Sequence, residues 1–203
     1  MPGPNFFAKL GLFVVEDFFD KQTCVQIQAE MRTVDHTRAE VVDGSSKVEL
    51  VKQTSRRTLD ARVSGRTSEQ VKVRLRSLQP ELESHFRIGL SDCETPQFLI
   101  YKPGDFFRPH RDGDDDPDKP EYINKRRVSL IIFLNDQSEE HRPNTYSGGS
   151  LTLYGVVSEP RWAKYGFHLT GVAGLLIAFR SELFHEVGEV AAGERYTIAS
   201  WFS

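Results

Sequence analysis

The chain has few cysteines, no long hydrophobic run and no excess of basic charge, and each absence excludes a class of protein. Two cysteines among 203 residues are too few for a disulfide framework and indicate a reducing compartment. The longest apolar runs, 129–134 and 172–179, are far shorter than the roughly 20 residues that cross a bilayer. The formal net charge of −3 does not favour binding to a nucleic-acid backbone. The first residues also have no secretory signal pattern, so we expect a cytoplasmic protein without a membrane or nucleic-acid partner.

The composition itself is that of an ordinary globular protein. Hydrophobic residues make up 38% of the chain and charged residues 27%, both close to the usual values. A chain of this length can bury one continuous core. We therefore expect a single domain spanning residues 1–203, while the sequence gives no indication of the oligomeric state.

Helical patterns dominate the first half of the chain. Asp20 is a plausible N-cap, and Cys24, Ile27 and Met31 follow it at helical spacing. A longer apolar stripe follows Ser68, and Pro80 predicts a break within it. That stripe comprises Val71, Leu75, Leu78, Leu82 and Phe86, and Gly89 is its predicted end.

From Gln97 onward the pattern changes to short strands between polar loops. The predicted strands are 97–101, 128–134, 150–154, 175–179 and 195–202. The loops 112–125 and 136–149 are long enough to predict lids, and the first contains the acidic run Asp114–Asp116. This order predicts an α+β fold, with a double-stranded β-helix (jelly-roll) core buttressed by N-terminal helices. Residues 1–93 would be mainly helical support, and 94–203 the jelly-roll core.

His110 and Asp112 form the first candidate metal-binding pair. In an extended segment, residues two apart point to the same face, so this imidazole and this carboxylate can reach one ion. Two histidines and one carboxylate form a facial set that suits Fe(II) and leaves coordination positions open. Of the other histidines, His185 is the strongest candidate for the third ligand, because it closely follows the apolar strand 175–179. The alternative for His185 is a core histidine that is hydrogen-bonded to the backbone.

Arg195 is the candidate anion-binding residue. It begins an apolar terminal strand, where a guanidinium is costly unless an anion meets it. Its planar fork suits a carboxylate, and Thr197 falls on the same face of the strand. The alternative is an internal salt bridge to one of the 29 acidic residues. A further group of arginines, Arg56, Arg57, Arg62 and Arg66, is expected on a solvated face.

Taken in order, these pieces resemble the prolyl 4-hydroxylase-like branch of the 2-oxoglutarate/Fe(II) oxygenases. The resemblance covers roughly Glu94 to the C-terminus. It is carried by Tyr101-Lys-Pro-Gly, His110 with Asp112, Arg126 with Ser129, Phe133-Leu-Asn-Asp136, Gly148-Gly149-Ser-Leu151, His185 with Val187 and Gly193, and Arg195 leading to Trp201. Two positions depart from the pattern. Phe133 stands where some relatives have a tyrosine that helps to hold the cosubstrate, and Ser129 stands where threonine is more usual.

The resemblance implies Fe(II) held by His110, Asp112 and His185. It also implies 2-oxoglutarate held by Arg195, with Tyr101 and Thr197 as lesser contacts. Dioxygen would be the oxidant and ascorbate the reductant, and the reaction would hydroxylate an unactivated C–H bond. Halogenating relatives have no carboxylate at the position of Asp112, so halogenation is not expected.

A prolyl residue in a peptide or protein is the first choice of substrate. The alternative substrate is a small molecule such as a free amino acid or a biosynthetic intermediate. Two other functions stay open: a sensor of metal or 2-oxoglutarate without turnover, and a cupin-like zinc or manganese site.

Overall fold

The computed structural model describes residues 4–39, 55–113, 119–140, 142–157 and 165–203 of the chain. The acidic run Asp114–Asp116 and part of the predicted loop 112–125 lie outside the described residues. Within the described ranges, no helix has the length and apolar character that a membrane crossing requires.

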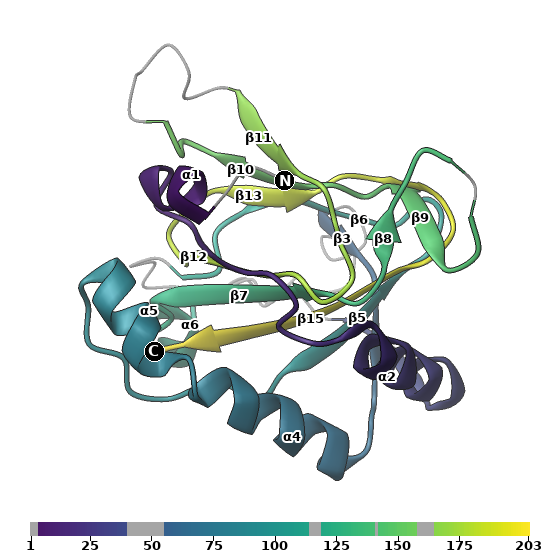
Figure 1. The fold of residues 1–203 in the computed structure, drawn as a ribbon, viewed down its shortest axis with the longest axis horizontal. Coiled ribbons are helices and arrows are strands. Elements are labelled where there is room, and N and C mark those ends of the chain that lie inside the picture. Colours follow the sequence, from purple (N-terminus) through teal and green to yellow (C-terminus); the bar gives the residue numbers. More distant parts are fainter. Residues whose placement is uncertain (1–3, 40–54, 114–118, 141, 158–164) are drawn as a thin grey trace.

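Two antiparallel sheets lie face to face (Figure 1). The larger has seven strands in the order β1 (Phe13–Val15), β12 (Leu176–Arg180), β7 (Val128–Phe133), β15 (Arg195–Phe202), β5 (Gln97–Tyr101), β4 (Leu59–Ala61) and β2 (His36–Arg38). The smaller has five, in the order β11 (Gly166–Leu169), β10 (Leu151–Tyr154), β13 (His185–Val187), β6 (Phe106–His110) and β3 (Arg56–Arg57). The chain passes repeatedly between the two sheets. This is the double-stranded β-helix that the sequence predicts.

A third, three-stranded sheet lies at one end of the sandwich, on the right of Figure 1. It consists of β14 (Val190–Ala192), β9 (Thr145–Gly148) and β8 (Asp136–Gln137). The predicted loop 136–149 is therefore partly strand.

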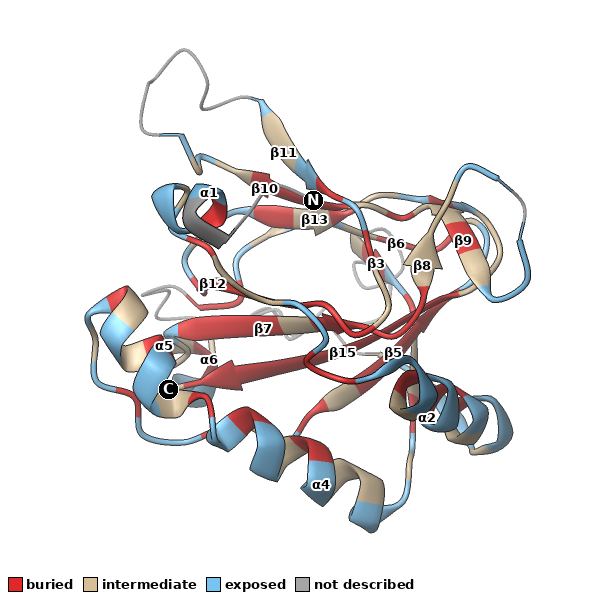
Figure 2. Cartoon of the chain, viewed as in Figure 1, coloured by how far each residue is buried: buried red, intermediate tan, exposed pale blue. Residues whose placement is uncertain are grey.

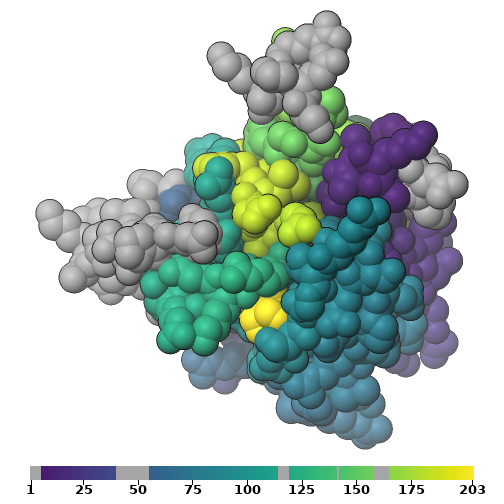
Figure 3. Space-filling model, turned by 90° about the vertical axis from the view of Figure 1, so that its left-hand side faces the viewer, coloured from purple at the N-terminus to yellow at the C-terminus, as the bar shows by residue number. Residues whose placement is uncertain are grey.

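The helices α2 (Lys21–Thr33), α4 (Gly65–Arg76) and α5 (Gln79–Phe86) pack against the outer face of the larger sheet (Figure 1). Their inward sides are buried and their outward sides exposed (Figure 2). In the side view, residues at the end of β15 show only as a small yellow patch beside the teal surface of the helices (Figure 3). Two short helices complete the described elements, α1 (Pro4–Lys9) and α6 (Glu121–Asn124).

The apolar residues of the larger sheet alternate between two cores. Leu130 and Ile132 of β7, like Tyr196 and Ile198 of β15, join the core beneath the helices. Phe133 faces the other way, into a second core with residues of the smaller sheet. All eight residues of β15 are buried. Because successive side chains point to opposite faces, Arg195 and every second residue after it face the interior between the sheets.

The predicted strands agree with β5, β7, β10, β12 and β15 to within one residue at each end. Asp20 is the N-cap of α2, as predicted, and its carboxylate accepts a hydrogen bond from the Thr23 backbone N–H at 2.7 Å. The break near Pro80 is confirmed, because α4 ends at Arg76 and α5 begins at Gln79. The predicted stop at Gly89 is wrong. Helix α5 ends at Phe86, and Arg87 takes the left-handed conformation at its C-cap.

Candidate active site

Strand register brings the two candidate metal-binding histidines together. His110 is the last residue of β6 and His185 the first of β13, and the two are directly paired across these antiparallel strands. Their ring centroids are 4.2 Å apart. His110 stacks on the Phe107 ring, and Phe179 meets His185 edge-on, so aromatic packing restricts the orientation of both imidazoles.

Asp112 lies just beyond β6, between the two histidines. Its carboxylate oxygens are each 3.4 Å from an Nε2 atom, Oδ1 from that of His110 and Oδ2 from that of His185. The backbone N–H groups of Asp112 and Gly113 both donate to the Ser181 carbonyl, which ties the loop to the segment leading into β13. One ligand atom from each of the three side chains lies within 4.8 Å of the others.

Backbone hydrogen bonds fix the tautomer of both histidines. Nδ1 of His110 is 2.8 Å from the Arg108 carbonyl, and Nδ1 of His185 is 2.9 Å from the Leu183 carbonyl. A carbonyl oxygen only accepts, so each Nδ1 carries a proton and donates it. Both Nε2 atoms are left facing Asp112, which is the arrangement that metal-binding histidines adopt.

The charges of the cluster also suit a cation. Burial lowers the pKa of His110 to about 4, and the neighbouring His185 contributes to the decrease, so His110 is neutral at pH 7. Burial would raise the pKa of Asp112, but the neighbouring His185, together with the contact to His110, outweighs burial and holds that pKa well below its usual range. Burial disfavours charge on His185 too, yet Asp112 raises its pKa. A metal ion would replace the His185 proton, as metal binding to histidine generally does.

Arg195 is buried, and no acidic residue in the described part of the chain pairs with it. Its side chain is 1% exposed, and Nη1 donates to the Thr197 hydroxyl at 3.2 Å. Among the residues that the structure describes, no carboxylate forms an ion pair with it, and its Nε has no hydrogen-bond partner. The internal salt bridge, which was the alternative from the sequence, is therefore absent in the described part of the chain. A buried guanidinium in this state is suited to an incoming anion.

Tyr101 contacts Arg195 and also lines the cavity that contains His110, Asp112 and His185. It is the cross-strand partner of Arg195, whose guanidinium lies 4.9 Å from the centre of the Tyr101 ring. Tyr101 also lines a cavity of about 530 Å³ whose walls include His110, Asp112 and His185. Tyr101 and the three candidate ligands therefore line one cavity, and Arg195 contacts both Tyr101 and Thr197.

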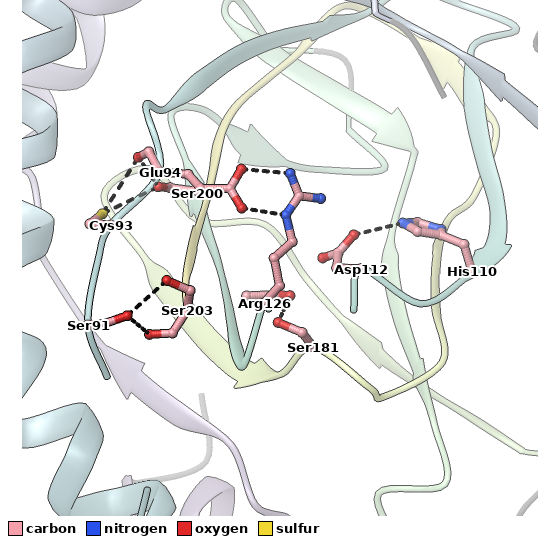
Figure 4. Close-up of polar contacts among 10 residues, drawn as sticks. Ser91, Cys93, Glu94, His110, Asp112, Arg126, Ser181, Ser200 and Ser203 are labelled. Carbon is pink, nitrogen blue, oxygen red and sulfur yellow. Dashed lines mark hydrogen bonds and ion pairs between the residues drawn. The ribbon is translucent and has the colours of Figure 1, made fainter. Parts of the chain in front are cut away.

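The sequence predicts no role in the site for two further groups in the cavity wall. Arg126 forms a two-pronged ion pair with Glu94, at 2.6 and 2.7 Å, and its guanidinium lies 3.8 Å from the centre of the Trp201 ring. In the view of Figure 4, Asp112 lies between this pair and His110. Arg56 was expected on a solvated face, and that expectation is wrong. It is 9% exposed and lies over the Phe107 ring. Neither group has a local sequence pattern, because each depends on contacts between segments that are far apart in the chain.

The family of the chain follows from a comparison of its sequence with known families. The sequence profile of the 2OG-Fe(II) oxygenase superfamily matches residues 96–203, slightly more than half of the chain. The chain belongs to this superfamily. Fe(II) and 2-oxoglutarate are therefore the cofactors that membership implies, and the buried nitrogen and oxygen donors of the cluster fit such a metal. No curated protein sequence matches this 2OG-Fe(II) oxygenase.

Solved structures share the fold of this 2OG-Fe(II) oxygenase at low sequence identity. A prolyl-4-hydroxylase from Pseudomonas putida is 24% identical, with a TM-score of 0.65 over 95% of this chain and 91% of that one. A prolyl hydroxylase from Trichoplax adhaerens, in complex with a hypoxia inducible factor peptide, is 19% identical, with a TM-score of 0.68 over 98% and 86%. A non-heme α-ketoglutarate-dependent epimerase from nogalamycin biosynthesis is 13% identical, with a TM-score of 0.64 over 98% and 81%.

Proposed function

We propose that the protein is an Fe(II)- and 2-oxoglutarate-dependent hydroxylase that acts on a prolyl residue in a peptide or protein. The observation that carries the proposal is a buried Arg195 that pairs with no acid among the described residues and packs on Tyr101, which lines the same cavity as His110, Asp112 and His185. A zinc or manganese site of the cupin type accounts for the cluster but gives Arg195 no carboxylate to bind. An enzyme that uses 2-oxoglutarate accounts for both.

Each residue of the site would have a defined role. His110, Asp112 and His185 would hold Fe(II), and Arg195 with Tyr101 and Thr197 would hold 2-oxoglutarate. When bound, these cofactors and dioxygen supply the oxidising chemistry, with succinate and carbon dioxide as by-products and ascorbate as the reductant. The protein orients the reactants and excludes water. Phe107 and Phe179 keep the two imidazoles in place, and the backbone carbonyls behind them retain the Nδ1 protons.

Unpaired polar atoms in the cavity wall support a substrate that contains amide groups. Within the described residues, Trp201 Nε1 and Gln97 Oε1 are both buried, and neither has a hydrogen-bond partner. One is a donor and the other an acceptor, and both side chains line the cavity. Buried polar groups normally have partners, and a peptide bond offers one group of each kind.

The shape of the surface beside the site supports an extended substrate. A second cavity of about 610 Å³ shares Pro109, Arg111 and Phe184 with the first. A free amino acid would not reach both cavities, but a polypeptide would. The prolyl hydroxylases with a similar fold agree with this choice, although the epimerase has a similar fold too. Fold likeness alone therefore does not decide the substrate.

A coupled assay tests the proposal. Purified protein with Fe(II), 2-oxoglutarate and ascorbate is given a proline-containing peptide, the same peptide with alanine in place of proline, or free L-proline. We expect succinate release to rise with the first alone, and that peptide to gain the mass of one oxygen atom. A response to free proline would favour the small-molecule alternative. No succinate under any condition would favour a sensor without turnover.

Peptide length gives a second, independent test of the substrate class. Phe184 is 41% exposed between the two cavities, with the Arg111 guanidinium over its ring. Phe184→Ala should raise KM about fivefold for peptides that reach the second cavity, the equivalent of roughly 1 kcal/mol of contact. Short peptides should be unaffected. Equal effects on long and short peptides would remove the second cavity from the binding surface.

A further inference from the structure

Tyr146 presents a buried hydroxyl group that the site described so far does not use. It lies on β9, outside the two large sheets, and its side chain is 1% exposed. Among the described residues, its hydroxyl oxygen has no hydrogen-bond partner. A buried hydroxyl without a partner is costly, so a ligand that supplies one would be favoured.

Glycines on both sides of Tyr146 fix where its ring and hydroxyl lie. Gly149 has a φ of +59°, and a Cβ placed on it would lie 3.2 Å from Arg195 Cδ and 3.4 Å from Tyr146 Cε2. The tyrosine ring therefore lies beside the stem of Arg195. A Cβ on Gly171 would lie 2.1 Å from the Tyr146 hydroxyl oxygen and 2.7 Å from Phe133 Cδ1. The hydroxyl therefore lies at the edge of the Phe133 ring.

The same ring of Phe133 faces the guanidinium. Arg195 Cζ is 5.3 Å from the centre of the Phe133 ring. In the family that the sequence resembles, some members have a tyrosine at this position for the cosubstrate, whereas Phe133 offers no hydroxyl. Tyr146 brings a hydroxyl to the edge of that ring from a different strand.

The protonation state of Tyr146 suits a donor. Burial raises the pKa of Tyr146, and the nearby Arg195 opposes this without reversing it. The phenol therefore keeps its proton at neutral pH and offers it to an acceptor. Near Arg195, the acceptor that the proposed function supplies is a carboxylate.

We propose that the Tyr146 hydroxyl donates a hydrogen bond to the distal carboxylate of 2-oxoglutarate, in place of the hydroxyl that Phe133 lacks. The proposal rests on the proposed function, since it takes Arg195 as the main partner of that carboxylate. Tyr146 is then a cosubstrate-binding residue, and the glycines at 149 and 171 provide the space that its ring requires.

Binding measurements on Tyr146→Phe test this assignment without turnover. The protein is loaded with Mn(II) and titrated calorimetrically with 2-oxoglutarate, and separately with oxalate, which can chelate the metal but has no distal carboxylate. We expect 2-oxoglutarate to bind roughly ten- to a hundredfold more weakly, as for the loss of a hydrogen bond to a charged group. Oxalate affinity should not change. The matched control is Tyr196→Phe, because Tyr196 lies next to Arg195 on β15 but faces the opposite core and donates to Glu194.

Thermal unfolding separates binding from a structural role. Without cosubstrate, Tyr146→Phe should unfold at the parent temperature or higher, because it removes a buried polar atom that has no partner. The stabilisation by 2-oxoglutarate should shrink. A lower unfolding temperature with unchanged 2-oxoglutarate affinity would overturn the proposal and make Tyr146 a packing residue. If Arg195→Ala also left 2-oxoglutarate affinity unchanged, the proposed function itself would lose its anion site.

Discussion

Replacing Arg195 by alanine removes the group that separates a 2-oxoglutarate enzyme from a generic metal site. Arg195 is buried and has no acidic partner among the described residues, so its guanidinium is available to an anion. Losing one partner of a buried, hydrogen-bonded charge pair costs about 2–5 kcal/mol. For 2-oxoglutarate this corresponds to a roughly 30- to several-thousand-fold loss of affinity. Arg195→Lys should be impaired less, since lysine keeps the charge but loses the fork.

Arg195→Ala should also reduce the rise in Tm that 2-oxoglutarate produces. With Mn(II) in place of Fe(II), 2-oxoglutarate at about 100 times its parent Kd stabilises the parent by about 2.7 kcal/mol. A variant that binds at least 30-fold more weakly would gain less than about 1 kcal/mol at that concentration. For a chain of this size, 1 kcal/mol moves Tm by roughly 2–4 °C. The expected shift therefore falls from roughly 5–10 °C in the parent to under about 4 °C in Arg195→Ala.

Two controls make this result specific. Mn(II) affinity should not change in Arg195→Ala, because the arginine is not a metal ligand. Arg180→Ala is the matched variant, since Arg180 ends β12 and donates to the Phe86 carbonyl, and it should keep the parent shift. A full shift in Arg195→Ala would refute the reasoning and place the anion site elsewhere.

Three further predictions follow from the fold and the site. His110→Ala and Asp112→Ala should each abolish metal binding and activity while circular dichroism stays that of the parent, and a metal-loaded, active variant would contradict the ligand assignment. Leu75→Ala, at a fully buried position of α4, should cost about 2–5 kcal/mol. That loss should appear in one transition shared by helix content and by the fluorescence of Trp201, read in a Trp162→Phe background, and an unchanged Trp201 transition would mean that the helices form a separate unit. Burial raises the pKa of the Cys24 thiol from 9.0 to about 11, so at pH 8 only about 0.1% of it is thiolate. Native Cys24 should react slowly with a disulfide reagent and faster as pH rises. Because the unfolded thiol ionises first, this group should make the native state less stable between about pH 9 and 11, and rapid reaction at pH 8 would show that the thiol is accessible.

The sequence predicted the parts of the fold that have a local pattern. Strands such as β7 and β15 are apolar on both faces and long enough to recognise, and Pro80 marks a helix break by its own chemistry. The end of α5 was misplaced because Arg87 adopts a left-handed conformation that is usually left to glycine. The short strands of the first half, such as β3 and β4, could not be located from a local pattern, because they depend on pairing with β6 and β5.

The residues of the candidate site also fall into two groups, those with a local sequence pattern and those without one. His110 and Asp112 are two residues apart, and Arg195 is an arginine in an apolar strand, so each carries its own signal. The residues that contact them in the folded protein have no such signal in the sequence. Glu94 with Arg126, Arg56 over Phe107, and Tyr146 beside Arg195 come from segments far apart in the chain. Only the register of β6, β13 and β15 and the packing of β9 bring them together.

The residues next to His110 and His185 in the sequence line the cavities and do not belong to the candidate metal site. Arg111 follows His110 and Phe184 precedes His185, and these neighbours line both cavities, with the guanidinium over the ring. The histidines are held by pairing between β6 and β13 and by carbonyls of the backbone. Substitutions at 111 and 184 would therefore reshape both cavities and leave the proposed metal ligands in place. On the proposed function, the substrate preference of this scaffold would be set one position away from the residues that hold the iron, so it could change while the chemistry stays the same.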